Sequence, residues 1–332
     1  MIKEEKMLLD LKSILEKGVQ KKQVRVVVCE GWDERCLQAT ASVQHLVKIV
    51  LLGNPEEIKK KVKELKLNIN KAEIIDYKNS PLKDELAKKL TELRKSKGLT
   101  LEEAKKLIED ENYFACVYCH AGYANAVAGS AICPTATLMR PALQILREKG
   151  KIVSEVSIAE DIKNDRTLFF TDASLNISPS PEELAQMALN AAECARDFKV
   201  IPKVALISFS TKGSGGDGPE IKPVLDALRI AKEKEPKLII DGEMQVDAAV
   251  SPNSAKKKCP NSPLKGEANV LVFPNLNTAN VFAHSMLQFS EMKYAFTVLK
   301  GMQHPVAILG RSTPLETIKL MLLSCAMQVN AK

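Results

Sequence analysis

Residues 203–231 read KVALISFSTKGSGGDGPEIKPVLDALRIA, and this stretch decides the class of fold. The run at 204–207 is short, apolar and partly β-branched, which is typical of a buried strand. A polar loop with four glycines follows, after which Leu225, Leu228 and Ala231 recur at helical spacing. A strand, a glycine-rich loop and a helix in this order predict an α/β protein that presents backbone N–H groups to an anion.

The loop at 208–218 carries the groups that an anion site needs. Its glycines allow positive φ and a close approach of the backbone, and Lys212 adds a positive charge. Hydroxyl groups at Ser210, Thr211 and Ser214 supply further donors. An ordinary polar turn is the alternative, because Gly, Ser and Asp also mark turns. The loop is not a Walker motif, because no Gly-Lys-Ser/Thr completes that pattern.

The composition is that of an ordinary globular protein with room for two domains. The chain has 332 residues, of which 45% are hydrophobic and 27% charged. Apolar runs such as 47–52 are too short to span a bilayer, and residues 1–18 predict an amphipathic helix rather than a signal peptide. We therefore expect a cytoplasmic protein without a membrane partner. A net charge of +7 suits small anionic substrates, and no basic block with interleaved aromatic residues indicates nucleic-acid binding.

The eight cysteines are spread over the chain, mostly in apolar runs, which predicts reduced and buried thiols. Residues 116–120 read CVYCH, the spacing of haem attachment, but the surrounding segment reads as a buried strand. The four histidines are not at ligand spacing. We therefore expect neither a haem nor a zinc site.

Strands and helices alternate along the chain, apart from a change after Gly150. The expected strands are 24–29, 48–52, 72–75, 113–119, 204–207, 237–240, 268–273, 294–299 and 305–309, with an antiparallel pair at 152–158 and 167–171. The expected helices include 83–97, 101–110, 135–149, 181–198, 219–234, 247–258, 276–289 and 314–329. This alternation predicts parallel sheets covered by helices on both faces, in two α/β domains.

Eight blocks of sequence resemble the phosphate acetyl/butyryl transferase family, most closely its phosphate acetyltransferase members, over nearly the whole chain. In the first half they are EGWDER at 30–35, ELRKSKGLTLEEA at 92–104, EDENYF at 109–114 and MRPALQILREKG at 139–150. In the second half they are SFSTKGS, IDGEMQVDAA, GEANVLVFPNLNTAN and LGRSTPLETI. The order RPALQ, FSTKGS and IDGE-x-Q-x-DAA is a highly specific combination.

The resemblance implies an architecture like that of isocitrate and isopropylmalate dehydrogenases. Two three-layer α/β/α domains then flank a cleft, and the protein is a homodimer. Domain one comprises 1–151 plus 303–332, and domain two comprises 152–302 with the STKGS loop.

The resemblance also implies the reaction, in which acyl phosphate and coenzyme A give acyl-CoA and phosphate. The thiolate attacks directly in a ternary complex, without a metal and without a permanently bound cofactor, and coenzyme A is a substrate. The implied site residues are Ser210, Thr211, Lys212, Gly213 and Ser214 for phosphate, Arg311 for the phosphoryl end, Arg94 and Arg140 for coenzyme A or catalysis, and Asp241, Glu243 and Asn280 in the cleft. Asp241, Glu243 and Asp247 also suggest a divalent metal site, but the matching family segment is a metal-free cleft wall.

Two catalytic positions of the family are changed in this chain. The family's closing motif carries a serine and an aspartate, the aspartate being the proposed base for the thiol. These positions are Gly310 and Thr317 here, whereas the arginine is kept as Arg311. Glu316 is an alternative base, but Thr313 and Glu316 are spaced as a capping box that directs the carboxylate to the backbone.

Three functions therefore stay open. The first is an active phosphate acyltransferase for acetyl or another short acyl group. The second is a catalytically impaired paralogue that binds coenzyme A or a partner, which the changes at 310 and 317, and Cys133 in place of the family's histidine, would allow. The third, a decarboxylating dehydrogenase, is disfavoured because the blocks match the acyltransferases better.

Overall fold

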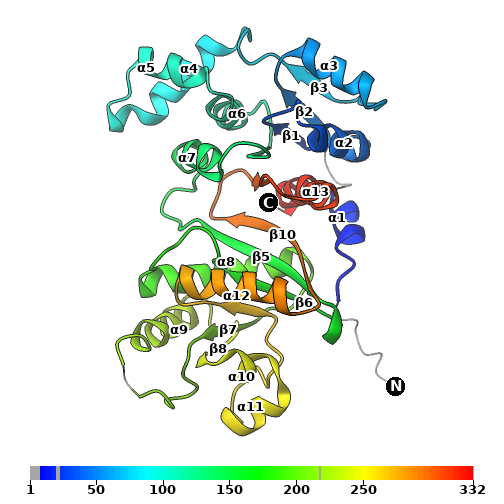
Figure 1. The fold of residues 1–332 in the computed structure, drawn as a ribbon. Coiled ribbons are helices and arrows are strands. Elements are labelled where there is room, and N and C mark those ends of the chain that lie inside the picture. Colours follow the sequence, from blue (N-terminus) through cyan, green and yellow to red (C-terminus); the bar gives the residue numbers. More distant parts are fainter. Residues whose placement is uncertain (1–7, 20–22, 217, 332) are drawn as a thin grey trace. The chain divides into compact units, whose positions relative to one another are not determined.

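The computed structural model describes residues 8–19, 23–216 and 218–331, and the chain forms two compact α/β units (Figure 1). One unit comprises Leu11–Lys149 and Met302–Lys332, and is called the first unit below. The other comprises Met1–Asp10 and Gly150–Gly301, and is called the second unit. The predicted α/β class is confirmed, because each unit is a sheet with helices on both faces.

The sheet of the first unit has the strand order β11-β4-β1-β2-β3, and all of its pairs are parallel. Its strands are β1 (Arg25–Val28), β2 (Lys48–Leu52), β3 (Glu73–Ile75), β4 (Ala126–Gly129) and β11 (Val306–Ile308). Val26, Val27 and Val28 of β1 are at most 1% exposed, as expected for a parallel strand covered on both faces.

Helices from distant parts of the chain cover this sheet. They are α1 (Leu11–Val19), α2 (Glu34–Val43), α3 (Pro55–Glu64), α4 (Lys83–Arg94), α5 (Leu101–Ile108), α6 (Glu111–His120), α7 (Thr135–Ile145) and α13 (Leu315–Ala331). Helix α13 packs with α1 and α2 on one face, while α6 and α7 pack together on the other (Figure 1). The last helix of the chain thus completes the unit that the first helix begins.

The strand predicted at 113–119 is wrong, because these residues belong to helix α6. Asp110 caps this helix, accepting from the N–H groups of Asn112 and Tyr113. Six consecutive residues of α6, from Phe114 to Cys119, are buried, so the helix is apolar all round and shows no helical period. Periodicity cannot separate such a helix from a buried strand. The strand is β4, in the small-residue stretch that follows.

The second unit has a mixed sheet of order β10-β5-β6-β9-β7-β8. Its strands are β5 (Ser154–Asp161), β6 (Arg166–Thr171), β7 (Lys203–Ile207), β8 (Ile239–Met244), β9 (Val270–Val272) and β10 (Met292–Lys300). β5 pairs antiparallel with β6, which confirms the predicted strand pair after Gly150. β10 also pairs antiparallel with β5, whereas the pairs β6·β9, β9·β7 and β7·β8 are parallel.

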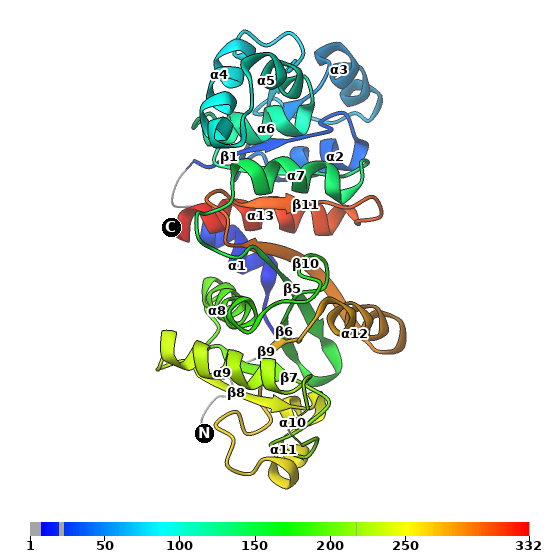
Figure 2. The same cartoon turned by 90° about the vertical axis from the view of Figure 1, so that its left-hand side faces the viewer.

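Helices α8 (Pro181–Asp197) and α9 (Lys222–Lys234) lie side by side on one face of this sheet (Figures 1 and 2). Helices α10 (Val246–Val250), α11 (Pro252–Lys258) and α12 (Leu276–Phe289) form a buried cluster with residues of β6, β7 and β9. The helix predicted at 247–258 is divided, because Ser251 leaves the helical conformation before Pro252 and caps α11. No helix in the described part of the chain is long and apolar enough to cross a membrane.

Candidate functional site

The STKGS loop, residues 210–214, lies between β7 and α9 in the second unit. Ser210 and Thr211 are buried, whereas Lys212, Gly213 and Ser214 are exposed. Lys212 and Gly213 have φ of 51° and 84°, the left-handed conformation that turns successive N–H groups to one side. The N–H of Thr211 donates to the Ser214 hydroxyl at 2.9 Å, which closes the turn.

Two buried carboxylates of β8 hold this loop. Glu243, 2% exposed, accepts from the Ser210 hydroxyl and from the Gly213 N–H, both at 2.8 Å. Asp241 accepts from the Lys212 ammonium at 2.6 Å. In this structure the donors of Ser210 and Gly213 therefore bind a carboxyl group of the protein itself, that of Glu243.

The Asp241 carboxyl stays ionised in spite of its burial. Burial alone would raise its pKa, but hydrogen bonds from Lys212 and Ser262 and the Lys212 charge lower the pKa below its ordinary value. The Lys212 ammonium also donates to the Gly242 carbonyl at 2.8 Å. These contacts fix the Lys212 side chain against β8.

The six residues 213–218, GSGGDG, also fit the letters G-x-G-x-x-G of dinucleotide-binding loops. In that fingerprint the glycines open the helix directly. Here α9 begins only at Lys222, and the Gly213 N–H donates to Glu243. The loop therefore does not have the structure of a dinucleotide-binding turn.

Two further predicted residues of the second unit are engaged elsewhere. Asp247 pairs with Lys258 at 2.8 Å, and the hydrogen bond from Lys258 lowers the pKa of this carboxyl. Asn280 donates to the Ala173 carbonyl at 3.2 Å from within α12. The N-cap of α12 is Asn275, which accepts from the Thr278 N–H, and the helix predicted at 276–289 is confirmed.

The predicted catalytic residues of the first unit lie in the loop 310–313 and the first turn of α13. Gly310 has a φ of 69°, Arg311 is exposed, and Thr317 is half-buried. The Glu316 side chain is 78% exposed and accepts from Lys319 at 2.6 Å, so its carboxylate forms an ion pair on the helix surface.

A serine does not fit easily at position 310. A Cβ atom there would lie 2.8 Å from Thr313 Oγ1, and the left-handed backbone disfavours any side chain. The local backbone at position 310 therefore suits glycine.

Sequence reasoning missed the roles of two residues in the EGWDER block. The Arg35 guanidinium donates to the carbonyl groups of Arg311 at 2.8 Å, Thr313 at 3.2 Å and Ala131 at 2.7 Å. The Glu30 carboxylate, in a residue 5% exposed, accepts from backbone N–H groups of the same 131–133 loop. The block itself was recognisable in the sequence, but its contacts are with segments about 100 and 275 residues away.

Cys133, which replaces the family's histidine, is a poor candidate for a reactive thiolate. Burial, together with a hydrogen bond and negative charge from Glu30, raises its pKa to about 11.

Arg94 lines a cavity of about 300 Å³ between α4, α5 and α6. Lys97 and Tyr113 also line it, and the Tyr113 hydroxyl donates to Gln144 at 3.1 Å. Burial raises the Tyr113 pKa, and the charges of Arg140 and Arg94 both oppose this rise. Of the two predicted coenzyme A arginines, Arg94 thus lines this cavity, whereas Arg140 acts on its Tyr113 phenol through charge.

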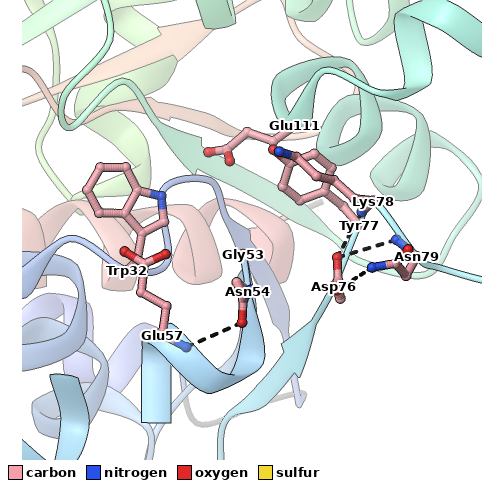
Figure 3. Close-up of a pocket in the computed structure, with 9 residues that line it drawn as sticks. All are labelled: Trp32, Gly53, Asn54, Glu57, Asp76, Tyr77, Lys78, Asn79 and Glu111. Atoms are coloured by element: carbon pink, nitrogen blue, oxygen red, sulfur yellow. Dashed lines mark hydrogen bonds between the residues drawn. The ribbon is translucent and has the colours of Figure 1, made fainter. Parts of the chain in front are cut away.

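A second cavity of the first unit, about 290 Å³, lies at the carboxyl ends of β1, β2 and β3 (Figure 3). Trp32 and Tyr77 provide its aromatic surfaces, and the Glu111 carboxylate points into it. Burial is the main cause that raises the Glu111 pKa to about 7, with the charge of Glu30 adding to it. Asp76 is held by Asn79 at 2.8 Å, as Figure 3 shows. The sequence analysis assigned no residue to this cavity.

Comparisons with known proteins cover nearly the whole chain. A model of the phosphate acetyl/butaryl transferase family matches residues 10–326. The phosphate acetyltransferase of Bacillus subtilis is 36% identical over 321 residues, covering 96% of this chain and 99% of that protein. That of Helicobacter pylori is 38% identical over 317 residues, covering 95% of this chain but only 61% of its own length.

Solved structures agree with the sequence comparison. A phosphotransacetylase from Streptococcus pyogenes superimposes with a TM-score of 0.92 at 34% identity, covering 97% of this chain and 98% of that one. EutD phosphotransacetylase from Staphylococcus aureus gives a TM-score of 0.88 at 35% identity, with 96% and 98% coverage. The chain belongs to the phosphate acetyl/butaryl transferase family.

Proposed function

We propose that this protein is an acyltransferase that interconverts acetyl phosphate plus coenzyme A and acetyl-CoA plus phosphate. The observation that supports it best is the family match over residues 10–326. The chain also carries Arg94, Arg140, Arg311 and the STKGS loop, to which the family resemblance assigns the substrates. In this proposal the metal-free reaction needs only binding groups for two anionic substrates and a way to form the thiolate.

Coenzyme A is assigned to Arg94 and Arg140. Both arginines act on Tyr113, and the cavity beside Arg94 also carries Lys97. A ligand with several phosphate groups suits such a cationic cavity, because guanidinium groups bind phosphate through two parallel hydrogen bonds.

The acyl phosphate is assigned to Arg311 and to the STKGS loop. Arg311 is exposed, and its backbone is fixed by Arg35, so its guanidinium is available to the phosphoryl group. In the loop, the exposed Ser214 hydroxyl is the group assigned to phosphate, while Glu243 accepts from Ser210 and Gly213. The N–H groups of Gly215 and Gly216 donate within the loop and shape its turn. Asp241, which pairs with Lys212, and Asn280 are further residues of the second unit that we assign to the substrate site.

The chemical step transfers an acyl group between oxygen and sulfur. The thiolate sulfur attacks the carbonyl carbon, the bond from that carbon to the bridging oxygen breaks, and phosphate leaves with the electron pair. The thiol proton must go to a base, since a thiol with a pKa near 8.5 is mostly protonated at neutral pH. Thr317 cannot accept it and Glu316 is exposed in an ion pair, so we assign thiol deprotonation to solvent.

The residues at 310 and 317 favour a second candidate, an impaired paralogue that binds coenzyme A without turnover. The test is thioester formation from coenzyme A with acetyl, propionyl and butyryl phosphate, using Arg311→Ala as a matched variant. Thioester formation that Arg311→Ala reduces supports the enzyme, and the preferred substrate identifies the acyl group. Coenzyme A binding by calorimetry without turnover of any acyl phosphate supports the paralogue.

We further propose a cytoplasmic homodimer that uses coenzyme A only as a substrate. The basis is the family resemblance together with exposed apolar side chains on α12, Val281 at 64% and Phe289 at 87% exposure. Light scattering on the purified chain gives its mass in solution, and a monomer at micromolar concentration contradicts this proposal.

A further inference from the structure

The EGWDER segment, residues 30–35, links two loops that carry the predicted substrate arginines of the first unit. It follows β1 and enters α2. Glu30 contacts the N–H groups of residues 131–133, which lead into α7 and Arg140. Arg35 contacts residues 310–313, which contain Arg311, and also the Ala131 carbonyl of the first loop.

The Glu30 side chain binds the backbone of the loop before α7. One carboxylate oxygen accepts from the Ala131 N–H at 2.7 Å, and the other accepts from the Ile132 and Cys133 N–H groups at 3.3 and 2.9 Å. The N-cap of α7 is Pro134, so these three N–H groups belong to the loop that leads into the helix and not to its first turn. The buried Glu30 carboxylate thus holds the backbone directly before α7.

Arg35 holds the other loop by its carbonyl groups. Nη1 donates to the carbonyls on both sides of the 310–313 turn, at 2.8 Å to Arg311 and 3.2 Å to Thr313. Nη2 donates to Ala131, and Asp33 accepts from Nε at 3.2 Å. Asp33 therefore orients the Arg35 guanidinium, and this guanidinium in turn holds the backbone of Arg311.

We propose that Glu30 and Arg35 are positioning residues with separate targets: Glu30 sets the coenzyme A end through α7, and Arg35 sets the acyl phosphate end through Arg311. This inference rests on the proposed function, because it assigns each loop to one substrate. Neither side chain needs to touch a substrate. The two effects are distinguishable because Glu30 binds three N–H groups of the 131–133 loop, whereas Arg35 binds one carbonyl there, at Ala131, and makes its contacts with Arg311 and Thr313 in the other loop.

The variants follow from the contacts. Glu30→Gln keeps the volume but places an NH₂ group against N–H donors, and is expected to raise the KM for coenzyme A about tenfold, with the KM for acetyl phosphate within about twofold. Arg35→Lys keeps the charge but loses the planar fork, and is expected to raise the KM for acetyl phosphate about tenfold, with the KM for coenzyme A little changed.

Matched controls separate positioning from general stability. Glu34→Gln makes the same change in the same segment at an exposed residue, and Arg229→Lys changes an arginine that pairs only with Glu233 on the surface. Neither control should alter either KM. A merely structural role lowers the folded fraction and kcat but leaves both KM values unchanged, and that outcome overturns the proposal, as does an equal rise of both KM values in either variant.

The experiment remains informative if the wild-type chain does not turn over any acyl phosphate. In that case the proposed function fails, and calorimetry with coenzyme A and with inorganic phosphate tests the positioning roles directly. Glu30→Gln should then weaken coenzyme A alone and Arg35→Lys should weaken phosphate alone; unchanged affinities overturn the proposal. If Glu30→Gln does not fold, Glu30→Asp keeps the charge and retracts the carboxylate, and a smaller effect selective for coenzyme A is expected.

Discussion

The STKGS loop and the 310–313 loop hold the predicted phosphate-binding and catalytic residues, and they are fixed by different means. The STKGS loop is bound to the neighbouring strand β8, through side chains that lie about 30 residues away in the chain. The 310–313 loop is bound at its backbone by Arg35, 275 residues away, and its own side chains are exposed. On the family resemblance, the STKGS loop is expected to match the family's residues, whereas Gly310 of the second loop and Thr317 of the following helix α13 are expected to depart from them. We infer that β8 constrains the STKGS side chains, while Arg35 constrains only the main chain of the 310–313 loop and leaves the side chains there and at the start of α13 free to vary.

The largest expected effect is a gain of activity in the loop that varies. Thr317→Asp should raise turnover about 100-fold or more, because a positioned base contributes about 10²–10⁴-fold. Position 317 lies in the first turn of α13, where the helix dipole favours a carboxylate and keeps it ionised. Wild-type activity should increase about tenfold per pH unit up to about pH 8.5, as the thiolate forms, and the variant should depend on pH less steeply.

Thr317→Asn is the control, since it has the same shape without a charge. A wild-type enzyme with ordinary turnover and a flat pH profile would show that another residue already serves as base. Gly310→Ser should not help, because its Cβ meets Thr313 and the left-handed backbone costs about 1 kcal/mol or more.

Arg311→Ala should lower kcat/KM by up to about 100-fold. The variant removes the positive charge of an exposed side chain. Losing a charge-assisted contact to phosphate costs about 1.5–3 kcal/mol in transition-state binding. The corresponding change in the other loop, Lys212→Ala, should lower stability as well, because it leaves Asp241 buried without its ammonium partner. Steady-state kinetics and urea unfolding on both variants distinguish these outcomes, and equal stability losses would remove the contrast between the loops.

Arg94→Ala should have a smaller effect and weaken coenzyme A binding about tenfold. Arg94 lines the cavity beside Tyr113, and one phosphate contact is lost while Arg140 remains. Titration calorimetry with coenzyme A measures the change, with exposed Arg229→Ala as the control. An unchanged affinity in the folded variant excludes Arg94 from the site.

The contrast also explains what could be read from the sequence. The strand, glycine-rich loop and helix around 203–231 were predictable, because their apolar period and turn residues act locally. The anion held by the loop was not, since it is Glu243 from another strand. In the first unit, α6 was missed because burial all round removes its period, and β4 because small residues carry little strand signal.

The site residues follow the same rule. Arg94, Arg140 and Arg311 were available from motif resemblance, which preserves residue types at fixed positions. Glu30 and Arg35 were quoted within a motif but had no assigned role, because their partners are backbone groups far along the chain. Backbone partners leave no signature in side-chain identity.

The smallest expected effect concerns the pH dependence of the loop that is bound to β8. The Asp241 pKa is lowered in the folded protein by Lys212 and Ser262 against the effect of burial, so this carboxyl stabilises the fold when ionised. Its contribution should be fully present above its ordinary pKa of 3.8 and lost as the pH falls through the lower folded value.

We expect Asp241→Asn to reduce the free energy of unfolding by about 1 kcal/mol at pH 7, discounted because Lys212 is partly exposed. The difference from wild type should shrink below pH 4 in urea unfolding. Asp247→Asn, at the exposed pair with Lys258, should change stability less at either pH. An Asp241→Asn effect that is constant with pH would mean that shape rather than charge holds this loop. The STKGS loop would then resemble the 310–313 loop, whose backbone carbonyl groups accept from Arg35.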